Sequence, residues 1–259
     1  MSNTEHLYKD IVRIQKVMER ECRMTDWSTA FERFLEFVLA GFDISGSPLK
    51  RPFSPDESRY CLALLQEWTM IMQERTKNGG WYDILGEFYM NGIAGRGKKS
   101  GMGQFFSPPH ICDFMAKITD PGENGGESVQ DCACGSGRML LAANALHPGN
   151  RCYAQDLDRI CCMMAACNFL IHGIRGEVVC GDALDPTDFR EGWRINEVLG
   201  YTGIPTVSVM KREDSVVGRS ALTTVAGTEK NKREAVSRQE EPVRKPERRK
   251  NECVQLSLF

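Results

Sequence analysis

The sequence predicts an α/β protein in which a helical N-terminal region precedes a parallel β-sheet. Two observations lead to this prediction. Over residues 1–98, apolar residues recur every three or four positions, which is the spacing of one helix face. From residue 101, short β-like runs alternate with helical stretches, the order that is typical of β-α-β units. The expected boundaries are 1–98 for the helical region and 99–215 for the α/β domain.

The helical region is expected to contain three main helices. Apolar stripes over residues 7–18 and 31–38 indicate the first two, and Thr25 or Asp26 can cap the start of the second. The third begins at Ser54–Glu57, where an N-cap serine, a first-turn proline and a capping-box glutamate follow one another. These stripes predict core packing.

The α/β domain is expected to begin with three strands joined by two helices. Its last part, Ile204–Met210, is expected to add one short strand at an edge of the sheet, because Pro205 cannot donate a ladder hydrogen bond. The first three strands are expected at Ser128–Asp131, Arg151–Asp156 and Glu177–Cys180, and their connecting helices at Arg138–Leu146 and Leu157–Ile171.

Composition narrows the class of protein. The chain has 259 residues, of which 41% are hydrophobic and 26% charged, as in an ordinary globular protein. No apolar run approaches the ~18 residues of a membrane span, and the polar first ten residues lack the order of a signal peptide, so we expect a cytoplasmic protein. The net charge of −2 provides no general basic field, so any contact with DNA phosphates needs local patches or a partner.

The 11 cysteines lack the paired spacing of a zinc site. We expect no metal and interpret these cysteines as reduced thiols that pack as small hydrophobic side chains.

The segment Asp131–Gly137 carries the clearest chemical signal. It follows an expected strand and opens an expected helix, and its glycines permit a tight turn that lets the backbone approach a ligand. The helix N-terminus offers N–H groups to a carboxylate or phosphate. Asp156 ends the next expected strand, at the spacing that places a carboxylate on ribose hydroxyls. A nicotinamide-dependent oxidoreductase is a weaker alternative, because Met139 and Leu140 stand where its last glycine would fall.

The segment Asp131–Gly137 also resembles the first motif of N6-adenine DNA methylases, as found in type I restriction–modification systems, with Cys132 where the family has proline. Gly103–Pro108 resembles the family segment that closes over the methionine end of the cofactor. Asp83–Tyr89 is similar to the helical segment that precedes it. Gln155–Asp158 fits the ribose-binding strand end, and Gly181–Leu184 fits the strand end that meets the adenine.

This resemblance implies a Rossmann-like methyltransferase core that uses S-adenosyl-L-methionine to methylate adenine N6 in DNA. It also implies DNA and a specificity or completing subunit as partners. The cofactor-binding residues that it implies are Gln104, Phe105, Phe106, Ser107, Pro108, Asp131, Ala133, Gly135, Ser136, Gly137, Asp156 and Asp182.

The family's catalytic motif, [Asn/Asp]-Pro-Pro-[Tyr/Phe], is missing after Asp182, so the catalytic residues stay unassigned. Asp185–Asp188 has only the first two residues of the motif and is expected to form a turn or to start a helix. A circularly permuted enzyme would use Ser107–His110, which holds the Pro-Pro pair, but the preceding Gly-Gln-Phe-Phe assigns this segment to cofactor closure.

The expected methyltransferase core is incomplete. Only about 35 residues separate Asp182 from a charged tail, too few for strands four to seven. The protein is therefore expected either to be inactive alone or to depend on a partner. The alternative is a non-catalytic, cofactor-binding remnant that is recruited to replicating DNA.

The C-terminal part of the sequence supplies the recruitment hypothesis. Residues 216–254 are polar and dense in charge, and we expect them to be disordered. The pentapeptide that follows them resembles the consensus that binds the bacterial DNA polymerase sliding clamp. The clamp-binding side chains that this resemblance implies are Gln255, Leu256, Leu258 and Phe259.

Overall fold

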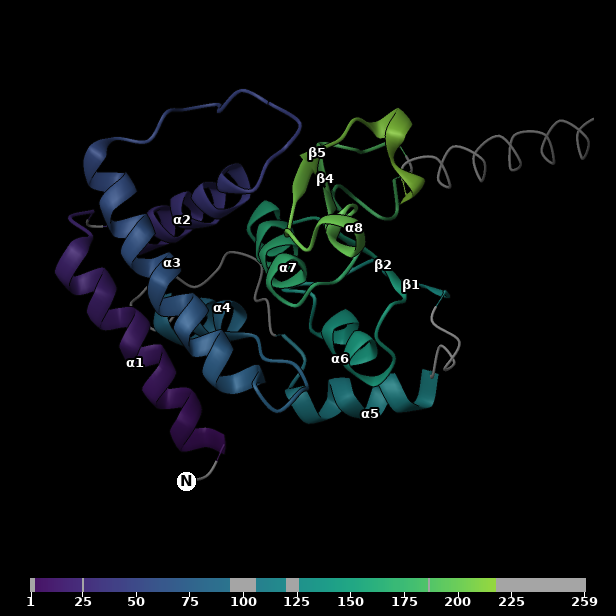
Figure 1. Cartoon of the computed structure of the whole chain (residues 1–259), viewed down its shortest axis with the longest axis horizontal. Helices are drawn as coiled ribbons and strands as arrows, with labels where there is room; N and C mark the ends of the chain where they lie inside the picture. Colours follow the sequence, from purple (N-terminus) through teal and green to yellow (C-terminus); the bar gives the residue numbers. More distant parts are fainter. Residues whose placement is uncertain (1–2, 25, 94–105, 120–125, 186, 218–259) are drawn as a thin grey trace, which may run out of the picture.

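A computed structural model describes residues 3–24, 26–93, 106–119, 126–185 and 187–217. A helical N-terminal region lies beside a five-stranded sheet, with helix α7 between the two (Figure 1). The helical region contains α1 (Asn3–Glu21), α2 (Trp27–Gly41), α3 (Pro55–Thr76) and α4 (Ile84–Glu87), followed by a π-helical turn at Phe88–Ile93. Within the described ranges, no helix has the length and apolar character needed to cross a membrane.

The expected helix starts are confirmed. Asp26 caps α2, because its carboxylate accepts from the backbone N–H of Ser28. Ser54 and Glu57 form the expected capping box at the start of α3, with each side chain accepting from the other's backbone N–H.

The three expected strands and the two helices between them are present. The parallel part of the sheet runs β1-β2-β3, and β4 and β5 continue it beyond β3 in antiparallel pairing. The elements are α5 (Pro109–Thr119), β1 (Ser128–Asp131), α6 (Arg138–Leu146), β2 (Arg151–Asp156), α7 (Arg159–Ile171), β3 (Gly176–Cys180), β4 (Glu191–Ile195), α8 (Leu199–Thr202) and β5 (Val207–Val209).

The antiparallel strands change the expected picture of a purely parallel sheet. After β3 the chain turns through Asp185, whose carboxylate accepts from the backbone N–H of Thr187, as expected for a turn. It returns along β3 as β4, a strand that the sequence did not predict, with Trp193 opposite Val178. The strand expected near Val207 is confirmed as β5, and it occupies the end of the strand order.

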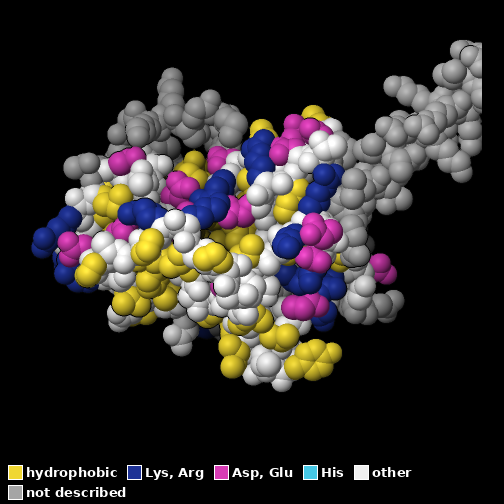
Figure 2. Space-filling model, turned by 90° about the horizontal axis from the view of Figure 1, so that it is seen from above, with side chains coloured by type: hydrophobic (Ala, Val, Ile, Leu, Met, Phe, Trp, Pro, Cys, Tyr) yellow, Lys and Arg dark blue, Asp and Glu magenta, His cyan; other side chains and the backbone are white. Residues whose placement is uncertain are grey.

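Charged side chains of both signs lie among hydrophobic and uncharged ones on the molecular face shown in Figure 2. Lys and Arg side chains lie beside Asp and Glu side chains on this face rather than in one basic field. This distribution agrees with the net charge of −2.

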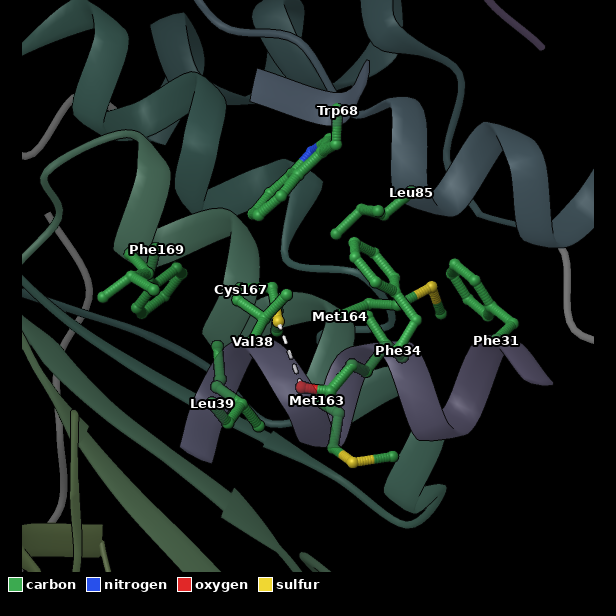
Figure 3. Close-up of a cluster of buried hydrophobic side chains, with 14 of the residues drawn as sticks. Phe31, Phe34, Val38, Leu39, Trp68, Leu85, Met163, Met164, Cys167 and Phe169 are labelled. Carbon is green, nitrogen blue, oxygen red and sulfur yellow. Dashed lines mark hydrogen bonds between the residues drawn. The ribbon is translucent and has the colours of Figure 1, made fainter. Parts of the chain in front are cut away.

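Helix α7 forms the centre of the hydrophobic core. Residues 161–170 are all buried, as expected for a helix that is covered on every side. One side of α7 packs on the sheet, and the other packs against α2 and α4. Figure 3 shows side chains from both regions in contact, including Phe34, Leu85 and Met164. One hydrophobic core therefore joins the helical region to the sheet.

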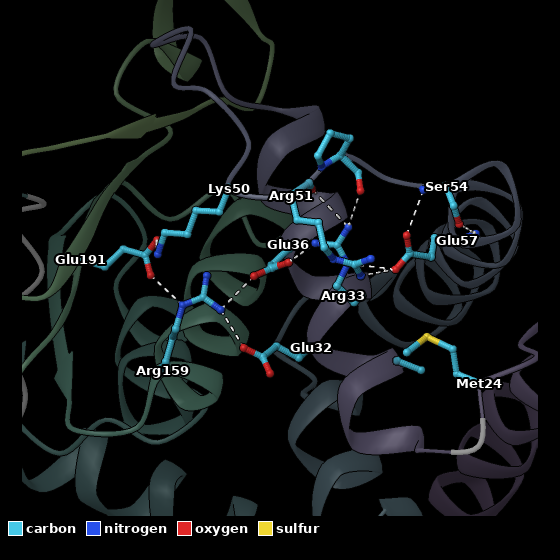
Figure 4. Close-up of polar contacts among 12 residues, drawn as sticks. Met24, Glu32, Arg33, Glu36, Lys50, Arg51, Ser54, Glu57, Arg159 and Glu191 are labelled. Carbon is cyan, nitrogen blue, oxygen red and sulfur yellow. Dashed lines mark hydrogen bonds and ion pairs between the residues drawn. The ribbon is translucent and has the colours of Figure 1, made fainter.

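Ion pairs reinforce this junction. Arg159, at the start of α7, pairs with Glu32 and Glu36 of α2 at 2.8 and 3.0 Å and with Glu191 of β4 at 2.7 Å (Figure 4). One guanidinium thus connects a helix of the N-terminal region with a strand of the sheet.

The opposite face of the sheet is covered by residues 210–217. Tyr153 and Val179 pack there against Met210 and Val217. Buried Glu177 holds this segment, because its carboxylate accepts from the backbone N–H of Val216 at 2.8 Å.

Candidate functional site

The carboxyl ends of the three parallel strands bring three acidic residues to one edge of the sheet. Asp131 and Asp156 end β1 and β2, and Asp182 follows β3 by two residues. The backbone N–H of Gly181 donates to the carbonyl of Asp156 at 3.0 Å, which keeps these strand ends together. Open α/β sheets bind ligands at this edge.

A glycine turn connects β1 to α6. Gly135 (φ 52°) and Gly137 (φ 89°) both adopt the left-handed conformation that favours glycine. A Cβ atom on Gly135 would lie 2.8 Å from the ring of Phe106, so a side chain there would also displace that ring. The turn needs glycine at position 135 for both reasons.

Asp156 holds this turn against β2. One of its carboxylate oxygens accepts from the backbone N–H of Gly135 at 2.8 Å, and the other accepts from that of Asp158 at 2.9 Å. The Cys134 backbone N–H adds a bond to the Gln155 carbonyl at 3.0 Å. Sequence reasoning assigned Asp156 a role toward a ligand only, whereas the structure also makes it the support of the glycine turn.

The turn forms one wall of a pocket of about 330 Å³, part of which is open to solvent. The pocket brings together six of the residues that the sequence suggested and adds Cys134, Arg138 and Met139. The six are Phe106, Ser107, Asp131, Ala133, Gly135 and Ser136.

The remaining suggested residues lie around this pocket or outside the described ranges. Gly137 and Asp156 belong to the turn and its support, and Pro108 is exposed just before α5. Asp182 does not line the pocket, and its carboxylate accepts from the backbone N–H of Leu184 at 2.9 Å. Gln104 and Phe105 are outside the described residues.

The carboxylate of Asp131 lies in surroundings that disfavour its negative charge. Burial raises the pKa of Asp131, the N–H of Ala133 opposes this rise, and the charge of Asp156 adds to it. Because the ionised form is disfavoured, a cationic group placed beside Asp131 would relieve the repulsion.

Arg138 is a site residue that sequence reasoning missed. It is 3% exposed, its Nη1 donates to the Ser107 carbonyl at 3.2 Å, and its guanidinium lies 5.5 Å from the centre of the Phe106 ring. It also pairs with Glu87 at 2.9 Å. The available signal was a charged residue that follows the glycine turn directly and opens an otherwise apolar helix.

The thiol that lines this pocket belongs to Cys134. Burial raises the pKa of the Cys134 thiol well above its usual value of 9, so the thiol stays protonated near neutral pH. Within the described ranges, no group of three His, Cys, Asp or Glu residues is placed to hold a metal ion.

Comparison with known proteins finds similarity to type I restriction–modification methylase subunits. The type I restriction enzyme MpnII methylase subunit of Mycoplasma pneumoniae is 30% identical over 114 residues, which are 41% of this chain and 20% of that protein. The chain therefore spans about a fifth of the length of this relative. The solved type I restriction–modification methyltransferase subunit of Streptococcus thermophilus matches 64% of this chain and 36% of its own, with 20% identity and a TM-score of 0.33.

The match to a family model covers the site itself. The model of the N-6 DNA Methylase family matches residues 81–200, a range that contains the glycine turn, the three strand-end aspartates and Phe106. Residues 81–200 of this chain are therefore similar to the N-6 DNA methylase family.

Proposed function

We propose that this protein binds S-adenosylmethionine and forms the cofactor-binding half of an adenine-N6 DNA methyltransferase of the restriction–modification type. One observation carries the proposal. A pocket at the carboxyl edge of the parallel strands, lined by Asp131, Phe106 and the glycine turn, lies in a segment of the N-6 DNA methylase family.

The residues that line the pocket, together with the two other strand-end aspartates, fit the groups of this cofactor. S-adenosylmethionine presents an ammonium group, and its positive charge beside Asp131 would favour the ionised carboxylate, which burial disfavours. It also presents two ribose hydroxyls, and each oxygen of Asp156 keeps accepting capacity beyond its one backbone bond. We assign Asp182 to the adenine edge. The cofactor, when bound, supplies the methyl group on its sulfonium.

The rings near the glycine turn are placed to exclude water. Phe106 lies against Gly135 and stacks on Tyr89, with ring centres 6.2 Å apart. We infer that Phe106 covers the methionine end of the cofactor.

We further propose that activity depends on a partner polypeptide. A doubly wound sheet has the strand order 3-2-1-4-5-6, so a fourth strand would pair with β1 on its outer side. In the described part of the chain, β1 has no neighbour on that side. Helix α5, which packs on α6 next to β1, exposes four large apolar side chains, Ile111, Phe114, Met115 and Ile118. A strand with an apolar face would cover both surfaces and add the missing base-binding motif.

The partner would also supply much of the contact to DNA. Figure 2 presents no single basic field, and the net charge is −2. DNA affinity depends strongly on phosphate neutralisation, so we assign this role to the completing or specificity subunit. An activity on chromosomal DNA places the protein in the cytoplasm.

Titration calorimetry with S-adenosylhomocysteine, the demethylated product, tests the cofactor proposal. Wild-type protein is expected to bind, and Asp156→Ala is expected to lose about 1–3 kcal/mol of affinity with the ribose and turn hydrogen bonds. Asp158→Ala is the control, because Asp158 caps α7 through the Ile160 N–H and does not line the pocket. No heat from folded wild-type protein at millimolar ligand contradicts the proposal.

The alternative is a non-catalytic cofactor-binding protein that is recruited to replicating DNA. We propose that Gln255, Leu256, Leu258 and Phe259, which lie outside the described residues, bind the bacterial sliding clamp. Three large apolar side chains can each contribute roughly 1.5–3 kcal/mol before ordering costs, so micromolar affinity is expected. Val216 and Val217, which were expected to begin a disordered tail, are held on the sheet. Residues 218–254 would serve as a tether.

Fluorescence polarisation of a labelled peptide covering residues 250–259 against the clamp tests the recruitment proposal. A peptide in which Leu258 and Phe259 are changed to alanine should bind much more weakly. Equal binding by the two peptides contradicts a clamp motif.

A further inference from the structure

Asp83 connects the helical region to the glycine turn. It caps α4 and is 4% exposed. One oxygen of its carboxylate accepts from the Gly86 backbone N–H and from Asn168 Nδ2, both at 2.8 Å. The other oxygen accepts from Ser136 Oγ and from Arg138 Nε, both at 2.6 Å. Three elements therefore meet at one buried carboxylate: α4, the turn with α6, and α7.

The hydrogen-bonding capacity of the Asp83 carboxylate is filled by groups of the protein itself. Each oxygen accepts two hydrogen bonds, which is the usual capacity of a carboxylate oxygen, and Arg138 supplies the compensating charge. Asp83 also does not line the pocket. Its contribution to ligand binding is therefore indirect.

Ser136 is the residue through which Asp83 acts on the turn. It lies between the two left-handed glycines, Gly135 and Gly137, so fixing Ser136 restricts the backbone of the turn whose Gly135 N–H donates to Asp156. Asp83 holds the Ser136 side chain, and Asn168 Nδ2 donates to the Ser136 carbonyl at 2.9 Å. The turn is thus held from α4 and α7 as well as from β2.

Arg138 extends the same contact to the second wall of the pocket. While Asp83 holds Nε, Nη1 donates to the carbonyl of Ser107 and the guanidinium faces the ring of Phe106. Glu87, the second carboxylate at this arginine, is buried, and burial raises its pKa although the charge of Arg138 opposes the rise. Asp83 is therefore the main anionic partner of Arg138.

We propose that Asp83 is a positioning residue that holds the glycine turn and Arg138 in the shape that binds the cofactor. This inference rests on the proposed cofactor function, and it adds that the N-terminal helical region is part of the binding machinery. A methyltransferase domain without residues 83–87 would have the pocket residues but not the shape of the pocket.

The variant Asp83→Asn tests the proposal. It keeps the size of the side chain but replaces one carboxylate oxygen with an NH₂ group. This group cannot accept the hydrogen bonds from Ser136 and Arg138. We expect amide hydrogen exchange at residues 134–138 to become at least about tenfold faster, which corresponds to about 1.4 kcal/mol of local stability. Affinity for S-adenosylhomocysteine should fall by about tenfold or more.

Asp10→Asn is the matched control. Asp10 is also a buried carboxylate, and it accepts from Arg75 at 2.6 and 2.8 Å and from the Tyr82 hydroxyl at 2.9 Å, without a contact to the turn. Both variants should lower the thermal midpoint, but only Asp83→Asn should change exchange at residues 134–138 and the affinity. Equal effects of the two variants on the turn overturn the proposal.

A second variant and a measurement without ligand complete the test. If Asp83→Asn does not fold, Asn168→Ala removes one donor to Asp83 and one to Ser136 from outside the pocket, and it should also speed exchange in the turn. Unchanged exchange in this folded variant overturns the proposal. Exchange is measured without ligand, so failure of wild-type protein to bind S-adenosylhomocysteine contradicts the proposed function and leaves the exchange result to decide the role of Asp83.

Discussion

The two flanks of the parallel sheet differ in how completely they are covered. Every residue of β3 is buried, and α7 beside it is enclosed by the helical region. On the other flank, the residues of β1 alternate between exposed and half-buried, and α5 exposes Phe114 by 59% and Ile118 by 61%. Parallel strands are normally buried on both faces. The β3 flank meets this expectation, whereas the β1 flank exposes apolar side chains of the kind found at protein interfaces.

The edges of the sheet differ in the same way. At the β5 edge, residues of the helical region pair with Val207, which accepts from the Ile44 N–H at 2.9 Å and donates to the Phe42 carbonyl at 2.8 Å. At β1, no such cover is present in the described ranges. Unpaired edges are normally protected, so this difference supports our proposal that a partner polypeptide docks on the β1 flank.

The largest expected effect contrasts two phenylalanines. Phe169 of α7 is fully buried, so Phe169→Ala should cost about 3–5 kcal/mol of unfolding free energy. Phe114→Ala on exposed α5 should change it by less than about 0.5 kcal/mol. Urea unfolding of both variants measures this contrast. Comparable losses would mean that the α5 face is covered in solution and that the two flanks do not differ.

An acid titration examines the ionic contacts within the helical region that covers α7. Burial would raise the pKa of Glu57, but the Ser54 N–H and then Arg51 and Arg33 outweigh it and lower the pKa from 4.5 to about 2 (Figure 4). A lowered folded-state pKa means that Glu57 stabilises the fold above pH 4.5 and that this contribution disappears as the pH falls toward 2.

Glu57→Gln should therefore be less stable than wild type at pH 7, and the difference should shrink between pH 4.5 and pH 2. Thermal unfolding of both proteins across this range measures it. A difference that stays constant down to pH 2 would show that the charge of Glu57 contributes nothing.

The smallest expected effect lies on the open flank. Because burial raises the pKa of Asp131, its ionised form is penalised in the folded state at neutral pH. Asp131→Asn keeps an acceptor for the Ala133 N–H and should stabilise the free protein, by less than about 1 kcal/mol, while weakening the binding of a cationic ligand. Unfolding with and without S-adenosylmethionine separates the two effects. A variant that loses stability but keeps its affinity would exclude Asp131 from the site.

The parts of the fold that the sequence predicted have strong local signals. The capping box at Ser54 and the alternation of strands and helices around Asp131 depend on neighbouring residues, and both are present. Strand β4 was missed because Glu191–Ile195 is short, contains a glycine and has charged residues among its apolar ones. Its antiparallel direction depends on the turn after β3, and the spacing of apolar residues does not predict the direction of a strand.

The pocket was predicted in part for the same reason. The order of the motifs along the sequence indicated Phe106 and the glycine turn. Asp83 and Arg138 are 55 positions apart in the sequence and come into contact only in the folded chain. A buried ion pair leaves no periodic pattern in the sequence. The support of the pocket therefore had to come from the structure.

Our central proposal is that this protein binds the cofactor and depends on a partner polypeptide to methylate DNA. The most direct measurement uses S-adenosylmethionine labelled in its methyl group, incubated with purified protein and duplex DNA, and counts label bound to the protein and label transferred to the DNA. We expect label to be retained by the protein, and lost from the Asp156→Ala variant, with none in the DNA. Robust labelling of the DNA by the protein alone would contradict the claim and would place the base-binding chemistry at Ser107–His110.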